Sequence, residues 1–220
     1  MSIVLIGDSR VKKIEVRECG DKVIDLMTDF PSLTFDLERR NVQKDSKSIS
    51  HARRKIGEML MSAQAYLPTG VKLLIKECHR PMAVQKMFWD TYSAYLKAKN
   101  PSWVEQQIYD ECSKFNAPLD VAPHTTGGAV DLTLVDLDGQ LLDMGTEFNA
   151  SPYETAGATY TDADDLSLLA KSNRRVLVKA MFEAGFTNYP TEWWHWSYGD
   201  KYWALVTNQP FAIYDSVELE

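Results

Sequence analysis

Cysteine and histidine are scarce in this chain. Its 220 residues include three cysteines, Cys19, Cys78 and Cys112, and four histidines. Because the cysteine count is odd and no two cysteines have Cys-x-x-Cys spacing, a disulfide framework, a thioredoxin-type motif and a zinc ribbon are all poorly supported. We expect three free thiols in a reducing compartment, since disulfides are rare in the cytosol. Any site made from histidine must use very few residues.

Basic residues and long apolar runs are also few. Lys and Arg total 24 against 31 Asp and Glu, which gives a net charge of −7. This argues against a general nucleic-acid or anionic-membrane binder, because phosphate contacts need a basic face. The N-terminal apolar run, Ile3 to Ile6, is shorter than the roughly 7–15 residues of a signal sequence, and no stretch approaches the roughly 18 apolar residues of a membrane span. We expect a soluble, cytoplasmic protein without a nucleic-acid or membrane partner, and the sequence leaves its oligomeric state open.

The rest of the composition is that of an ordinary globular protein, with 45% hydrophobic and 25% charged residues. It excludes a disordered chain and a collagen-like repeat. The length predicts a single domain over residues 1–220.

Helical periodicity is clearest in four segments. Apolar residues recur at intervals of three and four over 45–67, which predicts a helix. A second helix is predicted over 80–100, because Pro suits the first turn of a helix, and two more at about 102–114 and 165–184. The second helix carries an apolar face that we expect to be buried, formed by Val84, Phe88, Tyr92 and Tyr95.

Strand patterns lie between these helices. Short β-prone runs occupy 71–77 and 192–196, and an alternating run covers 129–137. The Asp138-Gly139 turn predicts a hairpin to a further strand at 140–143. Strands and helices do not alternate regularly, so we predict an α+β fold with a mainly antiparallel central sheet and flanking helices.

Four residues form a pattern that suggests metal chemistry. His124 lies in a Gly-rich loop, and Asp131 lies seven residues later in an apolar strand, where its charge needs compensation. His195 stands among three tryptophans. Two histidines and one carboxylate leave a tetrahedral zinc ion one open position for water, as in catalytic zinc sites. Glu192 would lie at the lip of the strand over 192–196, just after Pro190, where it would reach the metal-bound water as a general base.

Each of these residues also has a structural interpretation. A histidine can be a hydrogen-bonded structural residue, and the tryptophan cluster can be core. Asp131 can form a salt bridge at a strand end, since buried charges are usually paired or metal-bound.

The amino-acid sequences of four short motifs favour the metal site. HTTGGAVDLTL, from His124, and EWWHW, from Glu192, resemble the S-x-H-x-x-G-x-A-x-D and E-W-W-H motifs of zinc D-alanyl-D-alanine dipeptidases of the vancomycin-resistance type. KECHRP, which contains Arg80, resembles the G-Y-R-P segment of that family, and DMGTEFN resembles its M-G-x-x-F-D segment. The resemblance covers about 70–214.

The resemblance implies a function and a site. His124, Asp131 and His195 are implied to be the ligands of one zinc ion per chain, and Glu192 the catalytic base. Arg80 is implied to stabilise the scissile carbonyl as it becomes an oxyanion. The implied activity is hydrolysis of a small D-amino-acid dipeptide, D-alanyl-D-alanine.

The chain departs from the family pattern at three positions. Ala122 replaces a Ser, Asn149 replaces an Asp, and His79 replaces a Tyr. The first two lie where the family contacts its dipeptide, so they are candidate substrate-binding positions, and Asp143 or Glu147 are candidates to replace the lost carboxylate. Two alternatives follow: a zinc peptidase for another small cell-wall peptide, for example one of mixed L and D residues, or a non-catalytic zinc-binding module.

Overall fold

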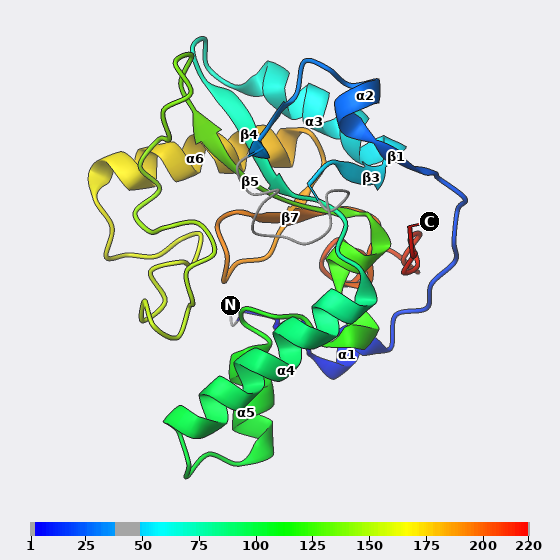
Figure 1. The fold of residues 1–220 in the computed structure, drawn as a ribbon, viewed down its shortest axis with the longest axis vertical. Helices are drawn as coiled ribbons and strands as arrows, with labels where there is room; N and C mark the ends of the chain where they lie inside the picture. The colour runs from blue at the N-terminus through cyan, green and yellow to red at the C-terminus, as the bar shows by residue number, and fades with distance from the viewer. Residues whose placement is uncertain (1–2, 38–48, 220) are drawn as a thin grey trace.

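The structure, a computed structural model, describes residues 3–37 and 49–219. Its central sheet has five strands (Figure 1). In order across the sheet they are β2 (Thr34–Phe35), β4 (Lys72–Glu77), β5 (Ala129–Val135), β7 (His195–Ser197) and β6 (Thr187–Asn188). β2 pairs with β4 in parallel, whereas the other pairs are antiparallel. The α+β class is confirmed. The sheet is mixed rather than mainly antiparallel, because the connection from β2 to β4 contains a helix and returns in the same direction.

A second, two-stranded sheet pairs β1 (Val23–Asp25) with β3 (His51–Arg53). The short helix α2 (Leu26–Asp29) follows β1 directly. Because β3 is held in this pairing, α3 begins at Arg54 and runs to Tyr66. The helix predicted over 45–67 is therefore wrong at its start, and 45–48 lie outside the described residues.

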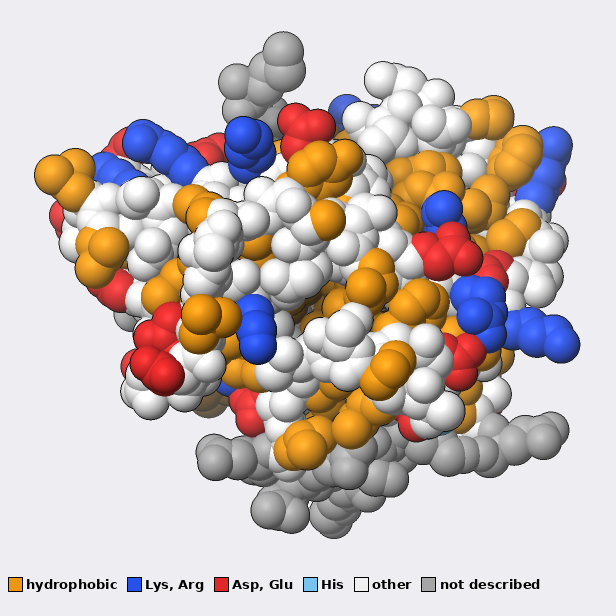
Figure 2. All heavy atoms as spheres, turned by 90° about the horizontal axis from the view of Figure 1, so that it is seen from above, with side chains coloured by type: hydrophobic (Ala, Val, Ile, Leu, Met, Phe, Trp, Pro, Cys, Tyr) orange, Lys and Arg blue, Asp and Glu red, His pale blue; other side chains and the backbone are white. Residues whose placement is uncertain are grey.

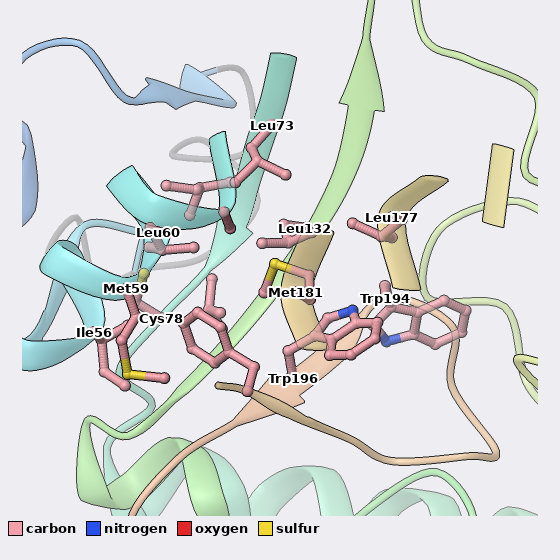
Figure 3. Close-up of a cluster of buried hydrophobic side chains, with 14 of the residues drawn as sticks. Ile56, Met59, Leu60, Leu73, Cys78, Leu132, Leu177, Met181, Trp194 and Trp196 are labelled. Carbon is pink, nitrogen blue, oxygen red and sulfur yellow. The ribbon is translucent and has the colours of Figure 1, made fainter. Parts of the chain in front are cut away.

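The main core lies between the sheet and two helices, α3 and α6 (Leu168–Glu183). Figure 3 shows Leu60 of α3, Leu132 of β5 and Met181 of α6 pointing toward one another, with Trp194 and Trp196 beside them. Every residue of β5 is buried, which is typical of a strand covered on both faces.

The hydroxyl of Ser167 accepts a hydrogen bond from the N–H of Ala170 and caps α6. Gly185, at φ 92°, follows the end of this helix in a left-handed conformation that suits glycine.

Helices α4 (Met82–Lys99) and α5 (Glu105–Cys112) pack against each other below the sheet in Figure 1. α5 starts later than the helix predicted at about 102–114, because its N-cap is Val104. The predicted apolar face of α4 is half-buried, and the buried residues of this helix are Gln85 and Leu96. This face therefore does not belong to the main core. Phe88, Tyr92 and Tyr95 instead line a cavity.

The remaining elements are short. They are α1 (Ser9–Lys12), α7 (Lys201–Val206) and the 3-10 turns η2 (Leu119–Val121) and η3 (Pro123–Thr126). The strand predicted at 140–143 is wrong, because only an isolated bridge joins Leu141 to Val135. The Asp136 carboxylate accepts hydrogen bonds from the N–H groups of Asp138 and Gln140, and it closes the turn there.

The outer surface carries charges of both signs. Acidic and basic side chains are interspersed with apolar ones on the face that Figure 2 shows. No helix in the described part of the chain is long and apolar enough to cross a membrane.

Candidate metal centre

Three side chains from separate segments meet at the middle of the central sheet. His124 lies in the η3 turn, whose C-cap is Gly127 with φ 70°. Asp131 lies on β5, and His195 is its direct partner on β7. The antiparallel register therefore places Asp131 and His195 side by side, and the turn folds His124 back over them.

The donor atoms of these side chains form a nearly equilateral triangle. His195 Nδ1 lies 2.9 Å from Asp131 Oδ1, and His124 Nε2 lies 3.2 Å from the same oxygen and 3.1 Å from His195 Nδ1. A tetrahedral zinc ion with bonds of roughly 2.0–2.1 Å needs donor atoms about 3.3 Å apart. The triangle thus fits one face of such a tetrahedron, and the three residues could hold a metal ion.

The hydrogen bonding of His124 leaves its second ring nitrogen directed toward this point. Its Nδ1 lies 2.6 Å from the carbonyl oxygen of Cys78. Since a carbonyl oxygen only accepts hydrogen bonds, Nδ1 donates and a neutral His124 presents the lone pair of Nε2 to Asp131 and His195. Such hydrogen bonds commonly orient metal-binding histidines. The neutral form of His124 thus presents a lone pair at the point where the three donor atoms could hold a metal ion.

Burial and neighbouring charges shift the pKa values of the four titrating groups at this centre, Asp131, His124, His195 and Glu192, in different directions. Burial would raise the pKa of Asp131, but the two imidazoles outweigh it and lower the pKa. Burial lowers the pKa of His195; it would also lower that of His124, but the Asp131 charge raises the latter above its ordinary value. Burial and the nearby Asp131 charge raise the pKa of Glu192 well above its ordinary value, against the opposing influence of Arg80. A proton on Glu192 is therefore held more tightly than on an exposed glutamate.

Glu192 occupies the turn that leads into β7. Its N–H donates to the carbonyl of Tyr189, and its own carbonyl accepts from the N–H of His195. The side-chain amide of Asn188 also donates to the carbonyls of Glu192 and His195. The sequence places Glu192 at the lip of the strand, and the structure has it there, buried beside the three donor residues.

Arg80 faces the same space from the residues that precede α4. Its guanidinium forms a two-point salt bridge with Glu77, with Nε–Oε1 and Nη2–Oε2 distances of 2.7 and 3.0 Å. Its Nη1 donates to the side chain of Gln85 at 2.8 Å. Burial alone would lower the pKa of Arg80, but the Glu77 charge raises it, so the guanidinium stays charged.

Sequence reasoning does not identify Glu77 and Gln85 as parts of the site. Glu77 ends β4 opposite Asp131 and lies three residues before Arg80. A glutamate at the end of a buried strand, close to an arginine, was the available signal for this pair. Gln85 gives no comparable signal in the sequence.

One cavity of about 830 Å³ opens onto the centre. Its lining includes His124, Asp131, Glu192, His195 and Arg80. The structure thus brings all five predicted metal-binding and catalytic residues to one pocket, whose size is typical of small-molecule sites.

The predicted substrate-binding positions are placed differently. Asn149 lines the cavity, with φ 63°. Ala122 is buried just before Pro123, which lines the cavity. Asp143 lies outside the lining, and its carboxylate accepts from the N–H of Gly145 and the hydroxyl of Ser167.

His79 and Glu147 also lie outside this lining. His79 Nε2 lies 2.7 Å from the carbonyl oxygen of Val217, a contact on the C-terminal segment. The structure therefore places neither residue at the triangle of donor atoms formed by His124, Asp131 and His195.

Comparison with known proteins identifies the family of the chain. The family model described as D-ala-D-ala dipeptidase matches residues 32–216. The chain is 32% identical to the D-alanyl-D-alanine dipeptidase of Synechocystis sp. over 63% of its length, and the match covers 64% of that relative. It is 26% identical to that of Escherichia coli, covering 79% of this chain and 83% of the relative. With the enzyme of Enterococcus faecium it shares 38% identity, over 67% of this chain and 72% of the relative. The family match contains the η3 turn, β5 and β7, and the chain belongs to the D-ala-D-ala dipeptidase family of metallopeptidases.

Proposed function

We propose that this protein is a zinc-dependent dipeptidase that hydrolyses D-alanyl-D-alanine. The observation that carries the proposal is the buried triangle of His124, Asp131 and His195, with Glu192 and Arg80 in the same cavity. A closed structural zinc site has four protein ligands, whereas three ligands beside a cavity leave room for water and substrate. The names of the relatives support the same substrate.

Each residue has a role in this proposal. His124, Asp131 and His195 would hold the zinc ion, which supplies Lewis acidity that polarises the scissile carbonyl and makes water more acidic. Glu192 accepts a proton from the attacking water and returns it to the leaving amine. The Arg80 guanidinium stabilises negative charge as it develops on the carbonyl oxygen, and loss of such a donor typically costs about 100- to 1000-fold in rate.

The setting is part of the same proposal. The three cysteines, all free, are compatible with a reducing compartment, and we place the enzyme in the cytoplasm, acting on a small fragment of cell-wall chemistry. The domain that carries out this reaction comprises residues 1–220.

The experiment is a hydrolysis assay on purified protein with D-alanyl-D-alanine, with zinc, with a chelator, and with zinc restored. Turnover is expected with zinc, to be lost with the chelator, and to return when zinc is restored. Glu192→Gln should retain bound zinc and lose nearly all turnover, whereas Glu183→Gln, an exposed change on α6, should keep both. Ordinary activity in Glu192→Gln would refute its role, and a zinc-saturated protein that cleaves no dipeptide would favour a non-catalytic module.

A further inference from the structure

The chain that follows α7 returns to the candidate site from outside the cavity (red in Figure 1). Residues 215–218, called the strap from here on, contact the η3 turn and the segment 79–82 that leads into α4. None of the strap residues is among the described residues that line the cavity. A role of the strap in the reaction must therefore act through the residues that it holds.

Val217 forms the central link of the strap. Its N–H donates to the carbonyl of Thr125 at 2.9 Å, and its carbonyl oxygen lies 2.7 Å from Nε2 of the buried His79 ring. Since a carbonyl oxygen only accepts hydrogen bonds, His79 donates from Nε2. Thr125 directly follows His124, and His79 directly precedes Arg80. Val217 thus holds the neighbours of a candidate metal ligand and of the guanidinium that faces it.

Two further contacts lie on either side of this link. The hydroxyls of Ser216 and Thr125 are 2.8 Å apart. Glu218 Oε1 accepts a hydrogen bond at 3.2 Å from the N–H of Met82, the first residue of α4. A helix leaves its first N–H groups without partners inside the helix, and a carboxylate suits that position. Side chains as well as backbone therefore join the strap to both segments.

Arg53 anchors the start of the strap. Its buried guanidinium donates from Nη2 to the carbonyl of Asp215 at 3.0 Å, and from Nε to the carbonyl of Thr126 at 2.8 Å. The N–H of Asp215 donates in turn to Glu18 Oε2 at 2.8 Å. The same guanidinium therefore holds the strap and the η3 turn together.

The η3 turn depends on such outside contacts. It spans four residues, and turns of the 3-10 type have poor internal hydrogen-bond geometry. The hydrogen bond that closes it, from the N–H of Gly127 to the carbonyl of His124, is long at 3.3 Å. The N–H of Arg80 donates to the same carbonyl at 3.1 Å. The strap adds a second connection between the segments of His124 and Arg80, through the residues next to them.

We infer that the strap positions His124 against Arg80, and that His79 is the positioning residue that holds the strap in place. The inference rests on the proposed zinc-dependent hydrolysis and extends the site to residues that contact neither the zinc ion nor the substrate. When the strap is released, the η3 turn moves, the donor triangle is less often complete, and the guanidinium shifts away from the developing oxyanion. Zinc affinity and kcat then both fall, whereas KM changes little because the strap lies outside the cavity.

The first test removes residues 216–220. The Kd for zinc is measured by competition with a chromogenic chelator, and kcat and KM are measured with D-Ala-D-Ala on the zinc-saturated protein. We expect the Kd to rise about 10- to 100-fold, the range typical of groups that orient metal ligands. We expect kcat to fall about 100-fold, as for a misplacement of about 1 Å, and KM to stay within about threefold. An unchanged Kd would overturn the inference.

Two substitutions test the single hydrogen bond from His79. His79→Gln keeps an N–H donor near the position of Nε2, whereas His79→Leu removes it. His79→Leu should raise the Kd for zinc about tenfold, and His79→Gln should keep it near the wild-type value. In the shortened chain, which lacks Val217, the two variants should have equal Kd values. Equal losses in the full chain, or unequal ones in the shortened chain, would overturn the inference. The full-chain pair decides the question even if the shortened chain does not fold.

Gly185→Ala is the matched control for a general loss of stability. Gly185 has φ 92° after the end of α6, a conformation that strains an L side chain, and it lies outside both the strap and the cavity lining. Its Tm should fall while its Kd for zinc and its kcat stay at the wild-type values. If it weakens zinc binding as much as His79→Leu does at an equal fall in Tm, the effect is general destabilisation and the inference is overturned.

The possible failures are distinguishable. If the wild type binds zinc and cleaves no D-Ala-D-Ala, the proposed function falls, and the Kd values of the His79 variants still test the strap. If the wild type is active and both His79 variants bind zinc as it does, the inference is overturned and the proposed function stands.

Discussion

The salt bridge between Glu77 and Arg80 can be tested by Glu77→Gln. Both side chains are nearly buried, with exposed fractions of 5% and 11%, and the two hydrogen bonds between them measure 2.7 and 3.0 Å. The substitution keeps the shape of the side chain and removes its charge. The Arg80 guanidinium then remains charged and buried, with Gln85 and one neutral amide oxygen as partners.

The size of the effect follows from this geometry. Removing one partner of a buried ion pair costs about 3–5 kcal/mol in the free energy of unfolding, because an uncompensated charge is left behind. Glutamine retains one acceptor, so we expect about 3 kcal/mol, or a fall in Tm of about 6–12 °C for a chain of this size. Activity should fall roughly 100-fold in kcat/KM, because Arg80 loses the partner that aims it at the developing oxyanion.

A double-mutant cycle with Arg80→Gln separates the role of Glu77 from general damage. Urea unfolding gives the stability of each variant, and hydrolysis of D-alanyl-D-alanine gives kcat/KM. If Glu77 acts through Arg80, Glu77→Gln costs no further activity in the Arg80→Gln background, and the double variant is more stable than Glu77→Gln alone. Losses that simply add in both measurements would refute this reasoning.

Three further outcomes are expected. Zinc at about a thousand times its Kd should stabilise the protein by about 4 kcal/mol, measured as a thermal shift that Asp131→Asn reduces and a chelator abolishes. Gly128→Ala should cost about 1–3 kcal/mol and weaken zinc binding, because the added Cβ would lie 2.5 Å from the carbonyl oxygen of Tyr198; an unchanged Tm would contradict this. Partial burial would raise the pKa of Glu18, but hydrogen bonds from backbone N–H groups and the charge of Arg53 lower it. Its contribution to stability should therefore be complete above about pH 4.5 and be lost as the pH falls; urea unfolding of Glu18→Gln should show a smaller acid loss than the wild type.

The fold shows which signals in the sequence are sufficient to predict a helix, its bounds and its burial. The helix predicted over 80–100 is confirmed as α4, because a proline marks its start and an apolar stripe runs along it. The sequence does not predict how deeply that stripe is buried, because a helix packed on a core and a helix that lines a cleft show the same periodicity. The start of α3 was unpredictable for another reason: β3 pairs with a strand almost thirty residues earlier, and local patterns carry no information about such pairing.

Some residues of the candidate site could also be predicted from the sequence, whereas others could not. The donor residues could be proposed because the motifs contain them, although their roles as ligands and base stay predictions. Glu77 lies only three residues before Arg80, but its place opposite Asp131 could not be predicted from the sequence alone, because the pairing of β4 with β5 shifts register between Ile75 and Glu77. The exposure of Asn149 to the cavity depends on a loop conformation with positive φ, which residue type alone does not determine.

The strongest argument for a metal comes from a group that the sequence cannot reveal. The backbone carbonyl of Cys78, at the end of β4, fixes the proton of His124 on Nδ1 and turns the lone pair of Nε2 toward Asp131 and His195. Any residue at position 78 would offer the same carbonyl, so the side chain there gives no sign of the role. Three segments must adopt their folded conformations together before the triangle exists: the end of β4, the η3 turn and the β5–β7 pair. We therefore expect metal binding and folding to be coupled in this protein, because the unfolded chain lacks the geometry that would hold an ion.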